Sequence, residues 1–372
     1  MSSPAQRLPA HPGQIFADAP RNVYWEVTIA CDLACKHCRA EAVAMRHPKE
    51  LTTEDGKALL HDVKDMGSIL ILTGGDPMKR QDLFELIDHG RSIHLPMAIT
   101  PSTTPTLARE LVGRFKDAGL TALGLSVDGP TAEVHDSFRG VAGTFEHSME
   151  ALAWAREVDI PVQVNTTVTT ETLPHLPALY RLLCERAAPP VRRWSLFLLV
   201  PVGRGITLGI PSADAVEKLF EWVYDTAARA PFHIGTVEAP HYRRYWFQRE
   251  LAAGVPLEAV LAKGRRMGLG VRDGNGVVFV SHLGEVTPAG FLPIVLGNVR
   301  ETKLSELYRT SPKMLELRDM DRLEGKCGLC EYRWVCGGSR ARAYGMTGNA
   351  MGSDPFCAYE PQVVDAVETA PA

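Results

Sequence analysis

Cysteines are the side chains in this sequence best suited to chemistry. The stretch "CDLACKHC" places three thiols within eight positions, at Cys31, Cys35 and Cys38. A disulfide takes two cysteines, a closed zinc site usually takes four ligands, and a nucleophile takes one. Three thiolates can hold three corners of an iron–sulfur cube and leave the fourth iron open. A zinc site with a distant fourth ligand, or a Cys31–Cys35 pair beside an unpaired Cys38, is the alternative.

A second group of cysteines lies near the other end of the chain. Cys327, Cys330, Cys336 and Cys357 are separated by two, five and twenty residues. Four thiolates complete a closed iron–sulfur cube, although a CxxC followed by two more cysteines is also typical of a zinc ribbon. The remaining cysteine, Cys184 in "LYRLLCER", is predicted to be a structural thiol in an apolar environment.

Composition and charge narrow the class of protein. The 372 residues are 45% hydrophobic and 23% charged, with a net charge of −4, as in an ordinary globular protein. We therefore expect no nucleic-acid partner. The N-terminus has no positive region followed by an apolar run, and the apolar stretch "WSLFLLVPVG" is broken by Pro201 and Gly203. We expect no membrane partner and a cytoplasmic location, where clustered cysteines more often bind metals or act in catalysis than form disulfides.

Short apolar runs alternate with helical patterns between residues 23 and 204. This alternation predicts an α/β protein with a parallel sheet and helical crossovers. The expected strands are 23–30, 68–77, 96–102, 122–129, 161–169 and 193–203. About six such units make either an open doubly wound sheet or a partial barrel, and the pattern leaves both possibilities open.

Polar residues gather where these expected strands end. Ligands bind at the carboxyl ends of parallel strands, so we expect six loops to converge on one mouth. Each residue taken singly also fits a cap or a turn. The candidate binding residues are Gly74, Gly75, Asp76, Pro77, Thr100, Ser126, Asp128, Asn165 and Arg204.

Three of these stretches resemble the radical S-adenosylmethionine (SAM) superfamily. "CDLACKHC" looks like its CxxxCxxC motif, and Trp25, Glu26 and Thr28 fit the lead-in of its SPASM-type members. "LTGGDP" resembles the GGEP motif, whose glycine-rich strand end contacts the amino group of SAM, with Asp76 in place of the usual Glu. "LGLSVDGPTAEVHDSFRG" resembles the family's fourth-strand segment, so Ser126 is a candidate for the ribose and carboxylate region of SAM.

This resemblance implies a fold and a first set of cofactors. The fold would be a partial (β/α)6 TIM-like barrel of radical SAM type with a small C-terminal α+β iron–sulfur domain. Cys31, Cys35 and Cys38 would hold a core [4Fe–4S] cluster, with SAM bound among the strand-end residues. Reductive cleavage of SAM would then give a 5′-deoxyadenosyl radical. The implied electron donor is a flavodoxin or a ferredoxin.

Beyond residue 205 we expect the β/α rhythm to stop. The pattern predicts bridging helices, then a β-hairpin at 274–293 with "HLGE" at its turn, then a turn and helix in "GNVRETKLSELYRTSP". The hairpin and the turn–helix are similar to SPASM and twitch auxiliary domains. We divide the chain into an extension (1–22), the barrel (23–205), a helical bridging region (206–273), an auxiliary domain (274–360) and a tail (361–372).

The resemblance implies one auxiliary [4Fe–4S] cluster, on Cys327, Cys330, Cys336 and Cys357. Full SPASM domains bind another cluster through cysteines near the hairpin. Here no cysteine occurs between 185 and 326. We therefore expect one auxiliary cluster.

Two phrases resemble the subgroup of haem d1 synthesis and the alternative haem pathway: "SHLGEVTPAGFLPIVLGNVR" and "KCGLCEYRWVCGGSRARAYGMTGN". The resemblance implies an enzyme of oxidoreductase or lyase type that oxidatively modifies a tetrapyrrole side chain, typically a propionate. A ribosomal peptide maturase and a non-catalytic zinc or iron–sulfur protein are the alternatives. His241, with Tyr242, Arg243 and Arg244, is a candidate for reading an acidic substrate, since arginine forks match carboxylates. An amphipathic bridging helix with solvated arginines is the alternative. No catalytic residue is assigned.

Overall fold

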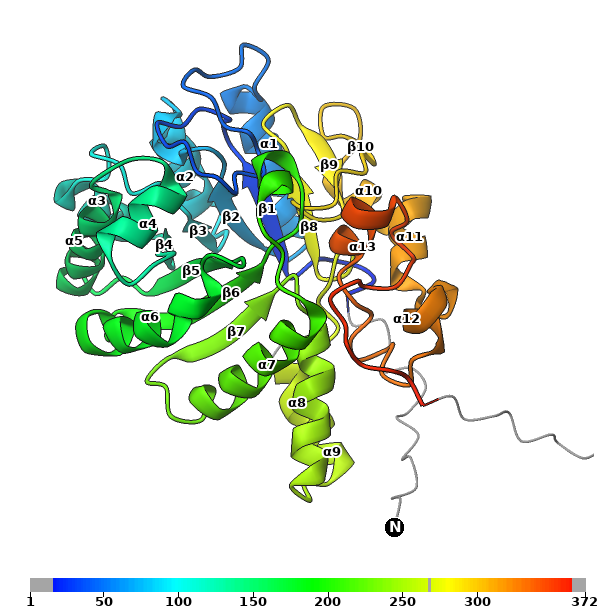
Figure 1. Ribbon diagram of the computed structural model, residues 1–372. Coiled ribbons are helices and arrows are strands. Elements are labelled where there is room, and N and C mark those ends of the chain that lie inside the picture. The colour runs from blue at the N-terminus through cyan, green and yellow to red at the C-terminus, as the bar shows by residue number, and fades with distance from the viewer. Residues whose placement is uncertain (1–15, 267–268, 363–372) are drawn as a thin grey trace, which may run out of the picture.

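The computed structural model describes residues 16–266 and 269–362. Its centre is one ten-stranded sheet in the order β10-β9-β8-β1-β2-β3-β4-β5-β6-β7, and Figure 1 shows this sheet curving with helices on its outer side. Neighbouring strands from β1 to β7 are all parallel. The parallel strands are β1 (Asn22–Glu26), β2 (Ile69–Thr73), β3 (Met97–Ile99), β4 (Leu123–Ser126), β5 (Val162–Val168), β6 (Val191–Leu198) and β7 (His233–Val237).

The strand order decides between the two α/β architectures. A doubly wound sheet reverses its strand order at a switch point, whereas barrel strands follow one another in chain order. Strands β1 to β7 follow chain order without a reversal. The protein is therefore a partial barrel of the TIM type.

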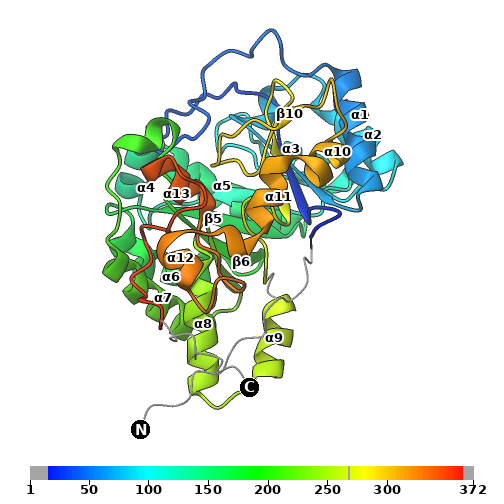
Figure 2. The ribbon, with the colours of Figure 1, turned by 90° about the vertical axis from the view of Figure 1, so that its right-hand side faces the viewer.

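One expectation about the bridging region was wrong. The β/α rhythm continues past residue 205, because β7 lies within 206–273 and pairs parallel with β6. The other elements of this region are helices: α7 (Ala213–Ala227), α8 (His241–Ala252) and α9 (Leu257–Arg266). Helices α8 and α9 extend below the barrel side by side in Figure 2.

Helices on the outer face bury the apolar side of the sheet. Along β1 the side chains alternate, so Val23 and Trp25 are buried against the helices while Tyr24 faces the interior. Helix α1 can approach Trp25 closely because residue 56 is a glycine. A Cβ atom at Gly56 would lie 2.7 Å from the Trp25 ring. The outer helices are α1 (Thr53–Asp65), α2 (Leu83–Ser92), α3 (Arg109–Asp117), α4 (Ala132–Arg139), α5 (Thr144–Glu157) and α6 (Leu176–Leu182).

The C-terminal hairpin joins the barrel sheet. The expected hairpin is present as β8 (Val277–Val280) and β9 (Glu285–Thr287), which pair antiparallel. Strand β8 also pairs parallel with β1, on the edge opposite β2, and β10 (Gly297–Asn298) follows β9. Figure 2 shows α10 beside α1, with α11 packed against α10. The C-terminal helices are α10 (Leu304–Thr310), α11 (Pro312–Arg318), α12 (Gly325–Leu329) and α13 (Arg340–Thr347).

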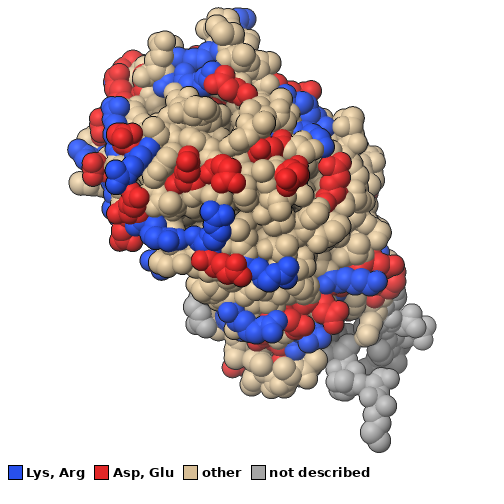
Figure 3. Space-filling view, turned by 60° about the vertical axis from the view of Figure 1, so that its left-hand side comes forward, with Lys and Arg blue, Asp and Glu red and all other residues tan. Residues whose placement is uncertain are grey.

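Short turns complete the fold. There are 3₁₀ segments at Pro77–Lys79, Leu173–His175, Gly203–Thr207 and Met320–Arg322, and a π-helical turn at Leu183–Ala187 that contains the half-buried Cys184. Among the described residues, no helix combines the length and the apolar character needed to span a membrane. Acidic and basic side chains are interspersed on the face shown in Figure 3.

Candidate active site

The cysteine loop follows β1 and is tied down on both sides. Cys31 and Cys35 are buried, and Cys38 is half-buried. The Cys31 N–H donates to the Val43 carbonyl at 2.7 Å. Arg204, which we expected to contact SAM, donates from Nε to the Cys35 carbonyl at 3.0 Å and from Nη1 to the Ala42 carbonyl at 3.3 Å. Arg204 therefore braces the backbone of the loop.

Each sulfur of this loop has a nearby hydrogen-bond donor. The Leu33 N–H donates to Cys31 Sγ at 3.4 Å, and the Ala42 N–H donates to Cys38 Sγ at 3.4 Å. Arg139 Nη1 lies 3.7 Å from Cys35 Sγ. Backbone N–H groups and a guanidinium stabilise anionic sulfur, so the loop fits three thiolates bound to iron.

The glycine-rich end of β2 packs directly on the backbone that leads into the cysteines. A Cβ atom at Gly75 would lie 2.4 Å from the Ala30 carbonyl oxygen, and one at Gly74 would lie equally close to that of Thr28. The Gly75 N–H donates to the Thr28 carbonyl at 2.9 Å. The two glycines therefore permit close contact between two loops of the protein itself, besides any contact with SAM.

Asp76 joins the loops that follow β2 and β3. Its buried Oδ1 accepts from the N–H groups of Met78 at 3.2 Å and Ser102 at 3.4 Å. Ser102 Oγ donates to the Gly75 carbonyl at 3.0 Å and lies 3.5 Å from Cys31 Sγ. Burial raises the pKa of Asp76 to about 6. Pro77, the last residue of the motif, begins the 3₁₀ turn that Asp76 caps.

The remaining strand-end candidates lie on adjacent strands, as the parallel sheet requires. Ser126 on β4 and Asn165 on β5 are register partners. Gly124 leaves room for the side chain of Thr100, since a Cβ atom at Gly124 would lie 2.6 Å from Thr100 Oγ1.

Asp128 is held by an ion pair. Its Oδ2 accepts from Arg139 Nε at 2.7 Å, and its Oδ1 accepts from the Thr167 N–H at 2.7 Å. Because Arg139 also reaches Cys35, this aspartate connects the end of β4 to the cysteine loop.

The residues of helix α8 that were expected to read an acidic substrate lie in two different pockets, and the buried His135 lies elsewhere. His135 Nδ1 accepts from the Asp128 N–H at 3.0 Å, a structural role. His241 and Arg244 line the pocket of the C-terminal cysteines, and Arg244 pairs with Glu217. Of the four residues expected to read an acidic substrate together, Tyr242 and Arg243 line the barrel cavity, while His241 and Arg244 do not. His241 and Arg244 lie one helical turn apart and face the cysteine pocket, whereas Tyr242 and Arg243 face the barrel cavity, so the four residues cannot all contact one ligand.

His282 links the hairpin to the cysteine loop through one carboxylate. His282 Nδ1 lies 2.6 Å from Glu26 Oε1, and Arg39 Nη2 lies 2.7 Å from Glu26 Oε2. Arg39 directly follows Cys38 in the chain. These contacts tie the turn between β8 and β9 to the end of β1 and to the cysteine loop.

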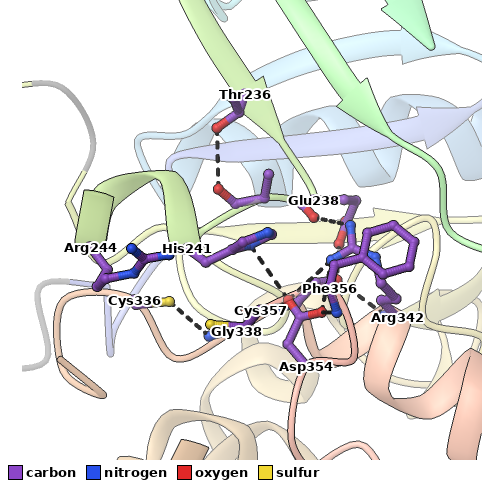
Figure 4. Close-up of polar contacts among 12 residues, drawn as sticks. Thr236, Glu238, His241, Arg244, Cys336, Gly338, Arg342, Asp354, Phe356 and Cys357 are labelled. Atoms are coloured by element: carbon purple, nitrogen blue, oxygen red, sulfur yellow. Dashed lines mark hydrogen bonds and ion pairs between the residues drawn. The ribbon is translucent and has the colours of Figure 1, made fainter. Parts of the chain in front are cut away.

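The four C-terminal cysteines converge on one small pocket. Cys327, Cys330, Cys336 and Cys357 all line it, together with the basic side chains of Arg244, Lys326 and Arg333. The Tyr332, Gly338 and Asp354 N–H groups donate to Cys330, Cys336 and Cys327 at 3.4, 3.3 and 3.4 Å. Figure 4 shows the contact between the Gly338 N–H and Cys336, and it also shows Cys357 and His241, which line the same pocket.

The thiols of this pocket fit a bound metal centre. Burial raises the pKa of Cys330 to about 12, so a bound cation is needed to keep this thiol ionised. Within the part of the chain that the structure describes, no three His, Cys, Asp or Glu side chains come close enough to hold a single metal ion. In an iron–sulfur cube each thiolate binds a different iron, so its ligands lie farther apart than around one zinc ion.

A cavity of about 400 Å³ lies inside the barrel beside β6 and β7. Its wall combines guanidinium groups with aromatic rings. The arginines are Arg21, Arg193, Arg243 and Arg272, and the aromatic residues include Tyr24, Phe197, Tyr242, Trp246 and Phe247. Sequence reasoning found Arg243 and missed the other three arginines. Gly338 lines both this cavity and the cysteine pocket, so the two are neighbours.

Two carboxyl groups in the cavity wall face each other. Glu238 follows β7 with a φ of 55°, and Asp273 precedes the C-terminal hairpin. Ser339 Oγ donates to Glu238 Oε2 at 2.6 Å, and Asp273 Oδ2 accepts from the Ala341 N–H at 2.8 Å. Burial, and then the charge of Asp273, raise the pKa of Glu238 well above its usual value, and we call these two residues the acid pair.

Known proteins resemble this chain over nearly its whole length. The Radical SAM superfamily model matches residues 25–183. An AdoMet-dependent heme synthase from Oleidesulfovibrio alaskensis is 40% identical, covering 94% of this chain and 90% of the relative. One from Methanosarcina barkeri is 36% identical, covering 93% and 98%. A pre-heme d1 synthase from Dinoroseobacter shibae is 31% identical, covering 93% and 88%.

Solved structures show the same fold at low sequence identity. Streptococcus suis SuiB bound to S-adenosylmethionine superposes with a TM-score of 0.69 at 16% identity, covering 92% of this chain and 78% of SuiB. The anSMEcpe structure with bound AdoMet gives a TM-score of 0.67 at 17% identity, covering 91% and 94%. The chain belongs to the radical SAM superfamily of iron–sulfur enzymes, in its alternative haem-biosynthesis subgroup, and this membership implies a [4Fe–4S] cluster and S-adenosylmethionine as cofactors.

Proposed function

We propose that this enzyme is a haem synthase that oxidatively decarboxylates propionate side chains of a tetrapyrrole. The relatives that share 36–41% of its residues are named AdoMet-dependent heme synthases. Cys31, Cys35 and Cys38 would hold the core [4Fe–4S] cluster. When reduced and loaded with SAM, that cluster supplies a 5′-deoxyadenosyl radical.

The strand-end residues would hold SAM. Gly74, Gly75, Asp76 and Pro77 present a narrow loop end beside the cysteines, and Arg204 fixes the cysteine loop from the other side. The other proposed contacts are Thr100, Ser126, Asp128 and Asn165. Because Asp128 is already engaged by Arg139, it would act by orienting its neighbours.

The observation that carries the substrate class is the barrel cavity. Arg243 Nη1 and Arg272 Nε are buried there without a hydrogen-bond partner among the described residues. Burial lowers the pKa of Arg243 to about 10 and that of Arg272 to about 9, so both stay charged at neutral pH. A tetrapyrrole with propionates offers carboxylates to such groups and a flat apolar ring to the aromatic wall.

The overall reaction fixes what the site must do. A propionate that becomes a vinyl group loses a hydrogen atom, carbon dioxide and one electron. The hydrogen atom goes to the deoxyadenosyl carbon, and the electron must leave the substrate. Cys327, Cys330, Cys336 and Cys357 would hold an auxiliary [4Fe–4S] cluster that supplies the acceptor. Because Gly338 lines both pockets, this cluster would lie next to the substrate cavity, and this supports its role as the acceptor.

A reducing cytoplasm with flavodoxin or ferredoxin as donor is the proposed setting. There the cysteines stay available as ligands. The same donor would reduce the core cluster before each turnover.

Anaerobic reconstitution followed by turnover tests the proposal. We expect about eight irons per chain, from two four-iron clusters. With an iron porphyrin that carries four propionates, we expect SAM-dependent loss of carbon dioxide and one hydrogen atom from each modified propionate. The Cys327→Ser/Cys330→Ser variant should keep about four irons and form 5′-deoxyadenosine without product. Zinc at the C-terminal site would refute the auxiliary cluster. Modification of a peptide and of no tetrapyrrole would refute the substrate class.

A further inference from the structure

Three basic side chains meet at the end of the barrel cavity far from the cysteine loop. Arg21 directly precedes β1, Arg193 lies near the start of β6, and His233 is the first residue of β7. All three line the cavity. Arg193 and His233 are register partners on neighbouring strands. We call these three residues the amino-end basic cluster.

No carboxylate of the protein neutralises this cluster. In residues 16–266 and 269–362, no ion pair involves Arg21 or Arg193. Glu238, one carboxyl group of the cavity wall, follows the last residue of β7, whereas His233 is the first residue of that strand. Burial, and also the charge of Arg21, lower the pKa of Arg193, and burial with the charge of Arg193 lowers that of His233. Arg21 and Arg193 therefore repel each other, and a bound anion would stabilise both of them.

The local packing holds the Arg193 guanidinium in one place. Arg193 Nε donates to Ser195 Oγ at 3.0 Å. A Cβ atom at Gly235 would lie 2.5 Å from Arg193 Nη2, so the absence of a side chain at Gly235 lets the guanidinium lie across β7. Neither terminal nitrogen of Arg193 donates to another group in the described part of the chain. A guanidinium fixed through Nε, with both Nη atoms available, can bind a carboxylate through two hydrogen bonds.

We propose that the amino-end basic cluster binds a substrate carboxylate that the enzyme does not modify, with Arg193 as the main positioning residue. This inference rests on the proposed function. Arg193 lies five residues before Leu198, the end of β6. At about 3.3 Å per residue, that places it about 16 Å from the strand ends that carry the cysteine loop. A carboxylate held here is out of reach of the radical, whereas a side chain across the ring is brought toward it.

The test compares Arg193→Gln with Arg192→Gln. Arg192 is exposed and lies on the same strand, so its variant is a matched control for loss of one positive charge. The probe is an iron porphyrin with four propionates, titrated by absorbance under anaerobic conditions. We expect Arg193→Gln to weaken binding 10- to 100-fold, since a charge-assisted hydrogen bond contributes about 1.5–3 kcal/mol. Arg192→Gln should bind like the wild type.

A second probe separates charge from shape. The tetramethyl ester of the same iron porphyrin has no carboxylates, so wild type and Arg193→Gln should bind it equally. Gly235→Ala, which displaces the guanidinium, should lose affinity for the tetracarboxylate as Arg193→Gln does, and Arg193→Lys should restore part of it. Product analysis adds a readout that a purely structural role would not move: with Arg193→Gln, KM should rise and the modified ring positions should become mixed.

The outcomes distinguish this inference from the proposed function. If a folded Arg193→Gln variant with wild-type melting and iron content binds the tetracarboxylate normally, the inference is wrong and the haem-synthase proposal stands. If the wild type binds neither the tetracarboxylate nor its ester, both are wrong.

Discussion

A buried ion pair connects the barrel to the C-terminal cysteine segment, and its removal should be costly. Arg342 Nη1 lies 3.0 Å from both carboxylate oxygens of Asp354, and both side chains are 0% exposed. Arg342 also donates to the Glu238 carbonyl at the end of β7 and lies over the Phe356 ring at 4.0 Å. Figure 4 shows these contacts. In Asp354→Asn the arginine keeps its place but loses its counter-charge.

The expected magnitude follows from the burial. Breaking a fully buried ion pair by removing one partner costs about 3–5 kcal/mol, because the other charge stays buried and uncompensated. With about 2.1 cal/mol/K of unfolding entropy per residue, a chain of 372 residues unfolds with about 0.8 kcal/mol/K. The melting temperature of Asp354→Asn should therefore fall by about 4–6 °C.

Calorimetry of the wild type, Asp354→Asn and the double variant Arg342→Met/Asp354→Leu checks this reasoning. The double variant removes both charges and keeps apolar volume, so it should lose less stability than Asp354→Asn. The single variants Arg342→Met and Asp354→Leu complete a double-mutant cycle that measures the coupling free energy of the pair. A melting temperature of Asp354→Asn within about 1 °C of the wild type would show that the pair contributes little to stability.

Three further changes should have distinct effects. Gly75→Ala would place a Cβ atom 2.4 Å from the Ala30 carbonyl oxygen, so it should lower the iron content of the core site and the affinity for SAM together. A variant that loses SAM affinity but keeps its full iron content would contradict this packing argument. Gly56→Ala should destabilise the protein, because overpacking against Trp25 costs about 1–3 kcal/mol and the gain in helix propensity is only about 1 kcal/mol. A variant that is more stable than the wild type in urea unfolding would refute this overpacking argument. Because the folded pKa of Glu238 lies above its usual 4.5, the folded state binds more protons than the unfolded one, so stability should fall as pH rises above about 4.5. Glu238→Gln should flatten this dependence in urea titrations, and an unchanged slope would argue against the raised pKa of Glu238.

The elements that were predictable from sequence are those with a local signal. The six strands from β1 to β6 follow from apolar runs between helical patterns, and the two cysteine groups follow from short spacings. Strand β7 was missed because its five residues carry little pattern of their own. What makes His233–Val237 a strand is its pairing with β6, which is a tertiary effect.

The cavity shows why part of the site was hidden. Arg21, Arg193, Arg243 and Arg272 come from four distant parts of the chain, so no spacing relates them. The glycine motif was recognised, but its contact with residues 28–30 depends on how two loops meet in space. Arg243 was found and Arg244 was misplaced because adjacent helix residues face different surroundings.

The pairing of β8 with β1 has a consequence for how the protein is made. Asn22 of β1 pairs with Val277 of β8. During translation, Val277 is synthesised 255 residues after Asn22. At about 5–20 residues per second, β1 waits about 13–51 s for its second neighbour. Until then one edge of β1 presents unpaired N–H and carbonyl groups that other nascent chains can join. A fragment ending at residue 205 would keep this edge open permanently, so we expect it to aggregate even though it contains the whole cysteine loop.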